Sequence, residues 1–168
     1  MKAISLWQPW ASLLVCGAKR VETRGWPIKY RGPLAVHATK RWDGELAALC
    51  ETEPFLSALL ANVADSESWR PADLPRGAVV GRVYVADCFP AECVIRDAID
   101  DGPEVLGGDA ALVRKLVIGS TEHAFGDYTA GRFAWLTHSP LRLEEPVPWA
   151  GCLGLFDVPD ELVPVLLT

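Results

Sequence analysis

Three charged side chains with complementary chemistry lie within six positions of one another: Lys19, Glu22 and Arg24. The residues around them are typical of an extended strand, so Glu22 and Arg24 are predicted to point to the same face, about 7 Å apart. Thr23 then points to the opposite face. Lys19 precedes the strand in a turn, where strand alternation does not define its direction.

This trio is suited to two kinds of chemistry. A lysine, a carboxylate and an arginine that converge on one ligand bind a base edge and a phosphate group. If burial shifts Lys19 and Glu22 toward neutrality, the same two groups exchange protons and form an acid–base pair, provided that the protein is an enzyme. The structural alternative is a surface ion pair, which contributes about 0–1 kcal/mol and has no further role.

The charge distribution favours a nucleic-acid ligand. Residues 1–42 hold eight of the sixteen Lys and Arg residues and one acid, a formal charge of +7, whereas residues 43–168 carry −13. Four of the seven tryptophans also lie in the first segment. Trp7 and Trp26 are the candidates for stacking on a base, and Trp10 shares an apolar helical stripe that indicates core packing.

Other polar and aromatic residues extend the candidate site, each with an alternative role. Gln8 has the donor and acceptor groups for a base edge, or it caps the helix that follows it. Arg31, Lys40 and Arg41 are candidate phosphate ligands, or they form a solvated edge. Tyr128 is placed to cover the mouth of the site, or it is a loop aromatic that packs on the domain.

Short strands separated by Gly and Pro dominate the predicted elements. Strands are expected at 2–6, 20–24, 34–38, 78–88, 132–138, 141–143, 147–149 and 153–158. Helices are expected after Pro9, Asp43, Pro54 and Asp160 and at 109–116, and loops at 64–77 and 97–110. Gly17 is expected to end the first helix in a left-handed conformation. The pattern predicts an α+β fold, a small mixed β-barrel with flanking helices, in one domain over 1–168.

The sequence offers no pattern for a metal site or a cofactor. The five cysteines include no C-x-x-C pair, and the three histidines lie at no zinc-finger spacing. No apolar run is long enough to cross a membrane, and the N-terminus does not resemble a signal peptide. We therefore expect a cytoplasmic protein with reduced thiols, no membrane association and no obligate protein partner.

Several motifs distributed over most of the chain point to one family. They are Ser5-Leu6-Trp7-Gln8-Pro9-Trp10-Ala11, Gly17-x-Lys19-x-x-Glu22-x-Arg24, Tyr30-Arg31-Gly32, His37-Ala38, Ala78-Val79-Val80-Gly81, Gly131-Arg132-Phe133-Ala134-Trp135, Pro146-Val147-Pro148-Trp149 and Gly154-Leu155-Phe156. In these motifs the chain resembles the ASCH family, the activating-signal-cointegrator homology domains. Residues 43–76 and 90–127 contribute little to the resemblance.

The resemblance implies a PUA-like fold and binding of RNA or a nucleotide. One branch of the family comprises amidohydrolases that act on acetylated cytidine, with a threonine nucleophile three residues after a lysine. Here Glu22 occupies that position, and Thr23 is the nearest hydroxyl.

We therefore predict an RNA- or nucleotide-binding domain whose ligand is single-stranded RNA, a nucleotide or a modified nucleoside. The predicted cleft is basic and lined with aromatic rings, and the first 40 residues build most of it. Its ligand-binding residues are predicted to be Trp7, Gln8, Lys19, Glu22, Arg24, Trp26, Arg31 and Tyr128. The alternative is a small hydrolase, an amidohydrolase or a ribonuclease, with Lys19 and Glu22 as the acid–base pair.

Overall fold

The computed structural model describes residues 1–63, 65–97, 102–107 and 114–163. The chain divides into two compact units, which are considered separately. Unit 1 consists of Met1–Ala18, Pro33–Tyr84 and Ser139–Thr168, and unit 2 of Lys19–Gly32 and Val85–His138. The prediction of a single domain stays a prediction.

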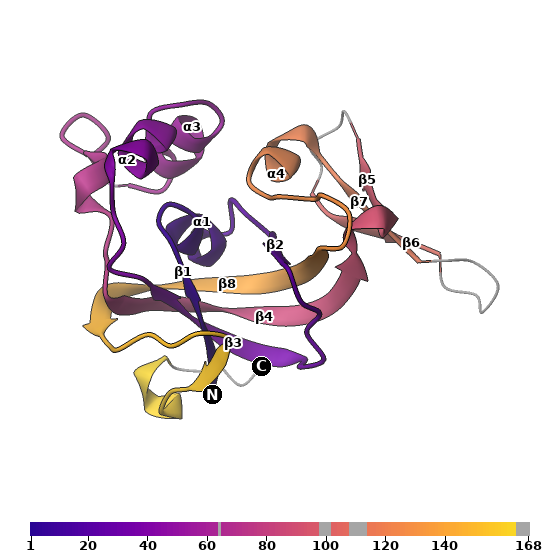
Figure 1. Ribbon diagram of the computed structural model, residues 1–168. Helices are drawn as coiled ribbons and strands as arrows, with labels where there is room; N and C mark the ends of the chain where they lie inside the picture. Colours follow the sequence, from indigo (N-terminus) through magenta and orange to yellow (C-terminus); the bar gives the residue numbers. More distant parts are fainter. Residues whose placement is uncertain (64, 98–101, 108–113, 164–168) are drawn as a thin grey trace. The chain divides into compact units, whose positions relative to one another are not determined.

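Unit 1 is built around two parallel strands, β1 (Lys2–Leu6) and β3 (Gly32–Ala38) (Figure 1). A third strand, β9 (Leu155–Asp157), pairs with β1 in the antiparallel direction. The register pairs Leu6 with Ala38, so both strands end at the same end of the sheet. Residues that follow these two strands are thereby brought together, although more than thirty positions separate them in the sequence.

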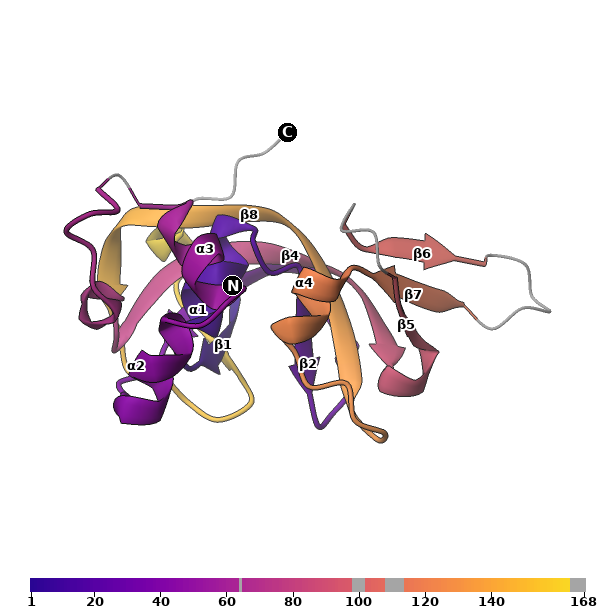
Figure 2. The same cartoon turned by 90° about the horizontal axis from the view of Figure 1, so that it is seen from above.

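The helices of unit 1 are short, and their ends follow from local chemistry. They are α1 (Trp10–Cys16), α2 (Gly44–Cys50) and α3 (Phe55–Leu60), and α3 packs against both of the others (Figure 2). Gly17 ends α1 with a φ of 85°, in the left-handed region that glycine adopts without a steric penalty. The Asp43 carboxylate caps α2 by accepting a backbone N–H at 3.0 Å. Both predicted helix boundaries are confirmed.

Unit 2 contains β2 (Val21–Arg24), paired antiparallel with the first part of β8 (Phe133–Pro148), and a separate three-stranded sheet. The small sheet has the order β5 (Val94–Arg96), β7 (Lys115–Ile118), β6 (Glu104–Leu106). The short helix α4 (Ser120–Ala124) follows β7. An apolar core holds these elements together through Val21, Phe89, Leu116, Ile118 and Ala134.

Two long strands, β4 (Ala78–Pro90) and β8 (Phe133–Pro148), each contribute residues to both units. Among the described residues the hydrogen-bonded strand orders are β2-β8-β4-β3-β1-β9 and β5-β7-β6. Each order ends in two different edge strands, so these sheets do not close on themselves. The α+β class is confirmed, but the β-barrel is not.

Several predicted element boundaries differ from those observed. The separate strands expected at 132–138, 141–143 and 147–149 form one continuous strand, β8, which its prolines do not interrupt. The expected loop 97–110 contains β6, and Pro71–Asp73 forms a 3-10 turn within the expected loop 64–77.

Two predicted helices are only partly covered by the described residues. For the helix expected at 109–116, positions 109–113 lie outside the described residues, and Lys115 begins a strand. Asp160–Leu162 forms a 3-10 turn, and positions 164–168 of the last expected helix lie outside the described residues.

The described part of the chain has no helix long and apolar enough to cross a membrane. Within the same residues no group of His, Cys, Asp and Glu side chains is arranged to hold a metal ion.

Candidate functional site

Lys19 lies in the interior of unit 2, where its side chain is only 1% exposed. Its Nζ donates to the backbone oxygens of Val21 and Phe125, the latter at 3.2 Å. The carboxylate of Glu22 completes its surroundings at 3.7 Å. Three acceptors around the Lys19 amino group hold its side chain in one orientation, and they occupy the donors that were predicted to hold a phosphate.

Glu22 is held between two cations without a hydrogen bond to either. Its Oε2 lies 3.7 Å from Lys19 Nζ and its Oε1 lies 3.6 Å from Arg24 Nη1. The Glu22 side chain is 8% exposed, whereas that of Arg24 is 28% exposed. Strand alternation therefore brings Glu22 and Arg24 together as predicted, and the carboxylate keeps free acceptor capacity.

Glu122 is a second buried carboxylate in this region, and the sequence analysis did not single it out. It lies in α4 and accepts the backbone N–H groups of Arg20 at 2.7 Å and Val21 at 3.0 Å. Burial raises the pKa of Glu122, and the Lys19 charge and the two N–H groups partly offset this effect. In the sequence, Glu122 is an acidic residue in the first turn of a short helix. Nothing in this local pattern indicates that its side chain contacts β2.

Tyr128 brings an unsatisfied hydroxyl into the same unit. Its buried Oη has no hydrogen-bond partner among the described residues. Burial raises the pKa of Tyr128, and the negative charges of Glu122 and Glu22 raise it further. The ring stacks on His123 with 4.9 Å between centroids, which holds the hydroxyl in place. We call Lys19, Glu22, Arg24, Glu122 and Tyr128 the Lys19 cluster.

Thr23, the nearest hydroxyl to the cluster in sequence, is turned away from it. Its Oγ1 accepts the backbone N–H of Asp127 at 3.1 Å. None of the hydrogen bonds described for Lys19 Nζ involves a hydroxyl. Within the described part of the chain, therefore, no serine or threonine hydroxyl is hydrogen-bonded to Lys19 Nζ.

Trp26 and Arg31 are also in unit 2, and both are engaged there. The Trp26 ring packs edge-on against the fully buried Trp135, with 4.6 Å between centroids. Trp135 Nε1 in turn donates to the Trp26 backbone oxygen at 3.2 Å. Arg31 pairs with Asp87 at 3.0 Å. Trp26 keeps a partly exposed ring, whereas the Arg31 charge is compensated locally.

Gln8 and Trp7 belong to unit 1 and have opposite surroundings. Gln8 is fully buried; its Nε2 donates to the Pro75 oxygen at 2.8 Å and its Oε1 accepts the Ser12 N–H at 3.1 Å. Both ends of the amide are therefore used inside the unit, and one of them caps α1. Trp7 is 44% exposed.

The His37 side chain is a buried structural group of unit 1. Its Nε2 lies 3.1 Å from the Trp149 oxygen, and its Nδ1 lies 3.1 Å from Ser5 Oγ. A neutral imidazole that donates from Nε2 and accepts at Nδ1 satisfies both contacts. Burial lowers the pKa of His37, and the bond to Trp149 partly opposes this shift.

Two arginine–tryptophan pairs form a basic surface on unit 1, which is exposed at Trp7, Lys40 and Arg41 and half-buried at Trp42 and Arg76. The Arg41 guanidinium lies 3.8 Å from the centroid of the Trp7 ring, and that of Arg76 lies 4.9 Å from the centroid of the Trp42 ring. The Lys40 side chain approaches Gly77 so closely that an added Cβ there would lie 2.9 Å from Lys40 Cγ. We call Trp7, Lys40, Arg41, Trp42 and Arg76 the Arg–Trp surface.

Chain topology explains why the Arg–Trp surface forms. Trp7 follows β1, and residues 40–42 follow the parallel strand β3. Both segments therefore leave the sheet at the same end. Arg76 precedes β4, and Gly77 N donates to the Ala38 oxygen at 2.7 Å, which brings Arg76 to the same end. The sequence analysis identified Trp7, Lys40 and Arg41, but nothing in the pattern around Arg76 indicated that it joins them.

One family model matches more than half of the chain. The ASCH domain model matches residues 4–98. Activating signal cointegrator 1 from Homo sapiens and from Mus musculus is 40% identical over 88 residues, 51% of this chain and 14% of the relative, so the match spans a small part of those proteins. The crystal structure of ASCH from Zymomonas mobilis has a TM-score of 0.48 and 16% identity, over 96% of this chain and 89% of that one.

Proposed function

The chain belongs to the ASCH domain family, and from this premise we propose that it binds single-stranded RNA through the Arg–Trp surface. The observation that carries the proposal is the pair of guanidinium groups stacked on tryptophan rings, Arg41 on Trp7 and Arg76 on Trp42. Positive charge and flat π-faces thereby occur together on exposed loops. These are the two features that bind an unpaired nucleotide chain.

Stacking supplies the sequence-tolerant part of the proposed binding. A base stacks on an exposed indole ring or on an arginine plane, and each such contact contributes about 1–3 kcal/mol. Arg41 is already oriented for this contact because Asp43 Oδ2 accepts from its Nε and Nη2, both at 3.4 Å. A guanidinium that is held in place loses less conformational freedom on binding than a mobile one.

Phosphate groups provide the second part. Lys40, Arg41 and Arg76 contribute three positive charges to the Arg–Trp surface, and Asp43 compensates one of them. The Arg41 side chain is 51% exposed, so its outer edge is open to a phosphate oxygen. This surface is suited to two or three phosphates of a short strand and not to the coating of a long duplex.

The Lys19 cluster has a separate proposed role in unit 2, the recognition of one base. Glu22 accepts no hydrogen bond within the described residues, and the Tyr128 hydroxyl also has no partner there. A base amino group that donates to Glu22 supplies the missing bond, as carboxylates do with cytosine N4. Lys19 acts as a positioning residue, because its ammonium group orients the carboxylate.

The geometry favours this role over hydrolysis. The Lys19 amino group donates to two carbonyl oxygens and faces Glu22, so its N–H groups are engaged within the unit and are not directed at a leaving group. The nearest threonine hydroxyl is engaged by Asp127. The hydrolase alternative predicts RNA cleavage, which the binding experiment also detects.

The test is fluorescence anisotropy with a labelled ten-nucleotide single-stranded RNA. Trp7→Ala and Arg41→Ala should each weaken binding by about fivefold to a hundredfold, because each removes one stacking contact. The double variant should lose less than the product of the two effects, since the side chains act as one pair. Lys29→Ala, which removes an exposed positive charge from unit 2, is the matched control.

If the two single variants and the double variant bind the RNA as tightly as the wild type and the Lys29→Ala control, the proposal is wrong. The same samples are run on a denaturing gel after binding. Intact RNA agrees with a binding protein, whereas cleavage that disappears in Glu22→Gln would establish the hydrolase alternative.

A further inference from the structure

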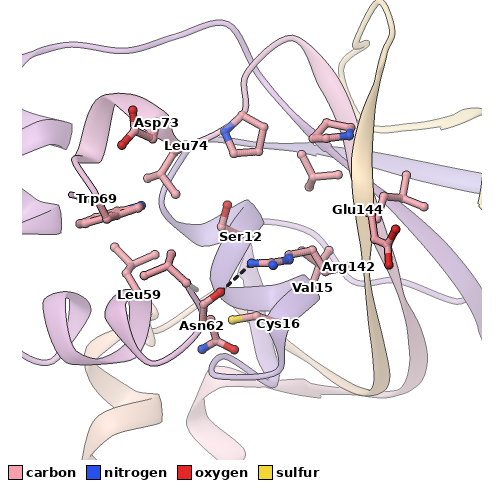
Figure 3. Close-up of a pocket in the computed structure, with 15 residues that line it drawn as sticks. Ser12, Val15, Cys16, Leu59, Asn62, Trp69, Asp73, Leu74, Arg142 and Glu144 are labelled. Carbon is pink, nitrogen blue, oxygen red and sulfur yellow. Dashed lines mark hydrogen bonds between the residues drawn. The ribbon is translucent and has the colours of Figure 1, made fainter. Parts of the chain in front are cut away.

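Unit 1 contains a pocket of about 260 Å³ that shares no residue with the Arg–Trp surface (Figure 3). The helix α1 presents Ser12, Val15 and Cys16 to the pocket at i, i+3, i+4 spacing. Leu59 of α3 and the residues Asn62 and Val63, which follow that helix, line another side. Drug-sized ligands occupy pockets of about 300–1,000 Å³, so this volume is suited to a smaller molecule.

The pocket combines apolar walls with a small number of polar groups. Leu59, Leu74 and Val80 are buried side chains of the wall, and the partly exposed ring of Trp69 lies at one side (Figure 3). Arg142, from the part of β8 that belongs to unit 1, extends its guanidinium group into the space beside Ser12 (Figure 3). This division into apolar walls and a localised donor group is typical of a ligand site.

Arg142 has an open pair of donors. Its Nη1 donates to the backbone oxygen of Asn62 at 2.7 Å, which anchors the side chain to the end of α3. Among the described residues, Nε and Nη2 have no hydrogen-bond partner, and no carboxylate pairs with the guanidinium. The Nε–Nη2 edge is a planar fork that matches the two oxygens of a carboxylate.

Ser12 adds a third donor. Its hydroxyl has no partner within the described part of the chain, and Figure 3 shows its side chain directed into the same space as Arg142. Cys16 is nearby, but its thiol donates to the Leu13 oxygen at 3.4 Å and burial raises the pKa of the thiol. Cys16 is therefore a wall residue and not a nucleophile.

We propose that this pocket binds a small monocarboxylate, with its carboxylate on the Nε–Nη2 edge of Arg142 and on Ser12 Oγ and its apolar body against Leu59 and Leu74. The charges of the lining select against a phosphate. Asp73 and Glu144 also line the pocket and repel any anion, so a ligand carboxylate has to lie on the Arg142 side, and a dianionic phosphate ester faces more repulsion than a singly charged carboxylate. This inference is independent of RNA binding.

Isothermal titration calorimetry of the full chain tests the proposal with three probes, phenylacetate, indole-3-acetate and isovalerate. At least one should bind saturably with a dissociation constant on the order of 0.1–1 mM, because one bidentate contact and a small apolar body supply modest affinity. Phenylacetamide and phenyl phosphate, which share the phenyl body, should each bind at least about tenfold more weakly.

Two variants locate the binding. Arg142→Lys keeps the positive charge and removes the fork, and it should weaken the best carboxylate by about tenfold or more. Ser12→Ala removes only the third donor and should cost about threefold to tenfold. Lys29→Ala is the control for net charge and should leave the affinity unchanged.

The proposal is overturned if none of the three carboxylates binds saturably. It is also overturned if phenylacetamide or phenyl phosphate binds as tightly as phenylacetate, or if Arg142→Lys and Ser12→Ala both retain full affinity. RNA anisotropy on Arg142→Lys separates the two proposals, since loss of carboxylate binding with unchanged RNA affinity concerns the pocket alone.

Discussion

Lys19 is a charged residue with a structural task. Its ammonium group is almost fully buried, and its surroundings consist of two backbone oxygens and the Glu22 carboxylate. A buried charge is tolerated only when its donors are paired, and these acceptors meet that requirement. Glu22 is oriented by Lys19 on one side and by Arg24 on the other, which makes it a fixed acceptor.

Glu22→Gln tests this arrangement at the level of one residue. We expect the free energy of unfolding to fall by about 1–3 kcal/mol, because the change removes a charge next to a buried ammonium group. A surface ion pair would lose less than about 1 kcal/mol. Urea denaturation measures the difference, with the exposed Glu145→Gln as control. Equal stability of the two variants would show that the Lys19–Glu22 pair contributes nothing.

At the level of elements, the carboxylate of Glu122 joins α4 to the beginning of β2. It accepts from two consecutive N–H groups, those of Arg20 and Val21, that would otherwise be buried without partners. The adjacent strand β8 also holds the beginning of β2, because Thr137 Oγ1 donates to the Arg20 oxygen at 2.9 Å. The start of β2 is thus held from two elements, and this constrains the strand that carries Glu22 and Arg24.

Glu122→Gln should lower the unfolding free energy by about 1–3 kcal/mol at neutral pH, since an amide provides one acceptor where the carboxylate provides two. The wild-type pH profile has a defined sign. Burial raises the pKa of Glu122, so the folded state binds this proton more tightly than the unfolded state. The contribution of Glu122 to stability therefore decreases as the pH rises from its ordinary pKa of 4.5 through the raised value.

Urea titrations between pH 4 and pH 8, run in parallel on the wild type and Glu122→Gln, measure this difference. The stability advantage of the wild type should be largest at the acidic end of the range. An advantage that grows with rising pH would contradict the raised pKa.

For the whole molecule, the uneven distribution of charge is the property that matters most. The chain carries a net charge of −6, yet its first 42 residues carry +7. Part of this positive charge is compensated inside unit 2, where Glu22 faces Lys19 and Arg24 and Asp87 pairs with Arg31. On unit 1, the exposed cations Lys40 and Arg41 lie beside the Trp7 ring, so their charge is available to a phosphate backbone next to a stacking surface.

The number of cations that contact phosphate groups determines how strongly RNA binding depends on salt. If Lys40, Arg41 and Arg76 neutralise about three phosphates, the logarithm of the affinity should fall with the logarithm of the salt concentration with a slope of about −2. Anisotropy titrations between about 50 and 300 mM salt measure it. A slope near zero would exclude phosphate contacts, and a slope steeper than about −4 would require cations beyond the Arg–Trp surface.

The local features of this protein could be predicted from its amino-acid sequence. Alternation in β2 was enough to place Glu22 and Arg24 on one face and Thr23 on the other. Gly17 and Asp43 marked a helix end and a helix start because their preferences depend on their own backbone and side chain. The N-terminal motifs predicted the ASCH family, which the family model confirms over residues 4–98.

Contacts between residues that are far apart in the sequence became visible only in the three-dimensional structure. Glu122 bonds to the backbone of Arg20 across 102 positions, and Arg142 reaches the carbonyl of Asn62 across 80. Residue spacing defines directions within one helix or strand, whereas contacts between elements depend on the path of the chain between them. The burial of Lys19, the position of Arg76 on Trp42 and the pocket beside Arg142 all arise from that path, so no local pattern could have predicted them.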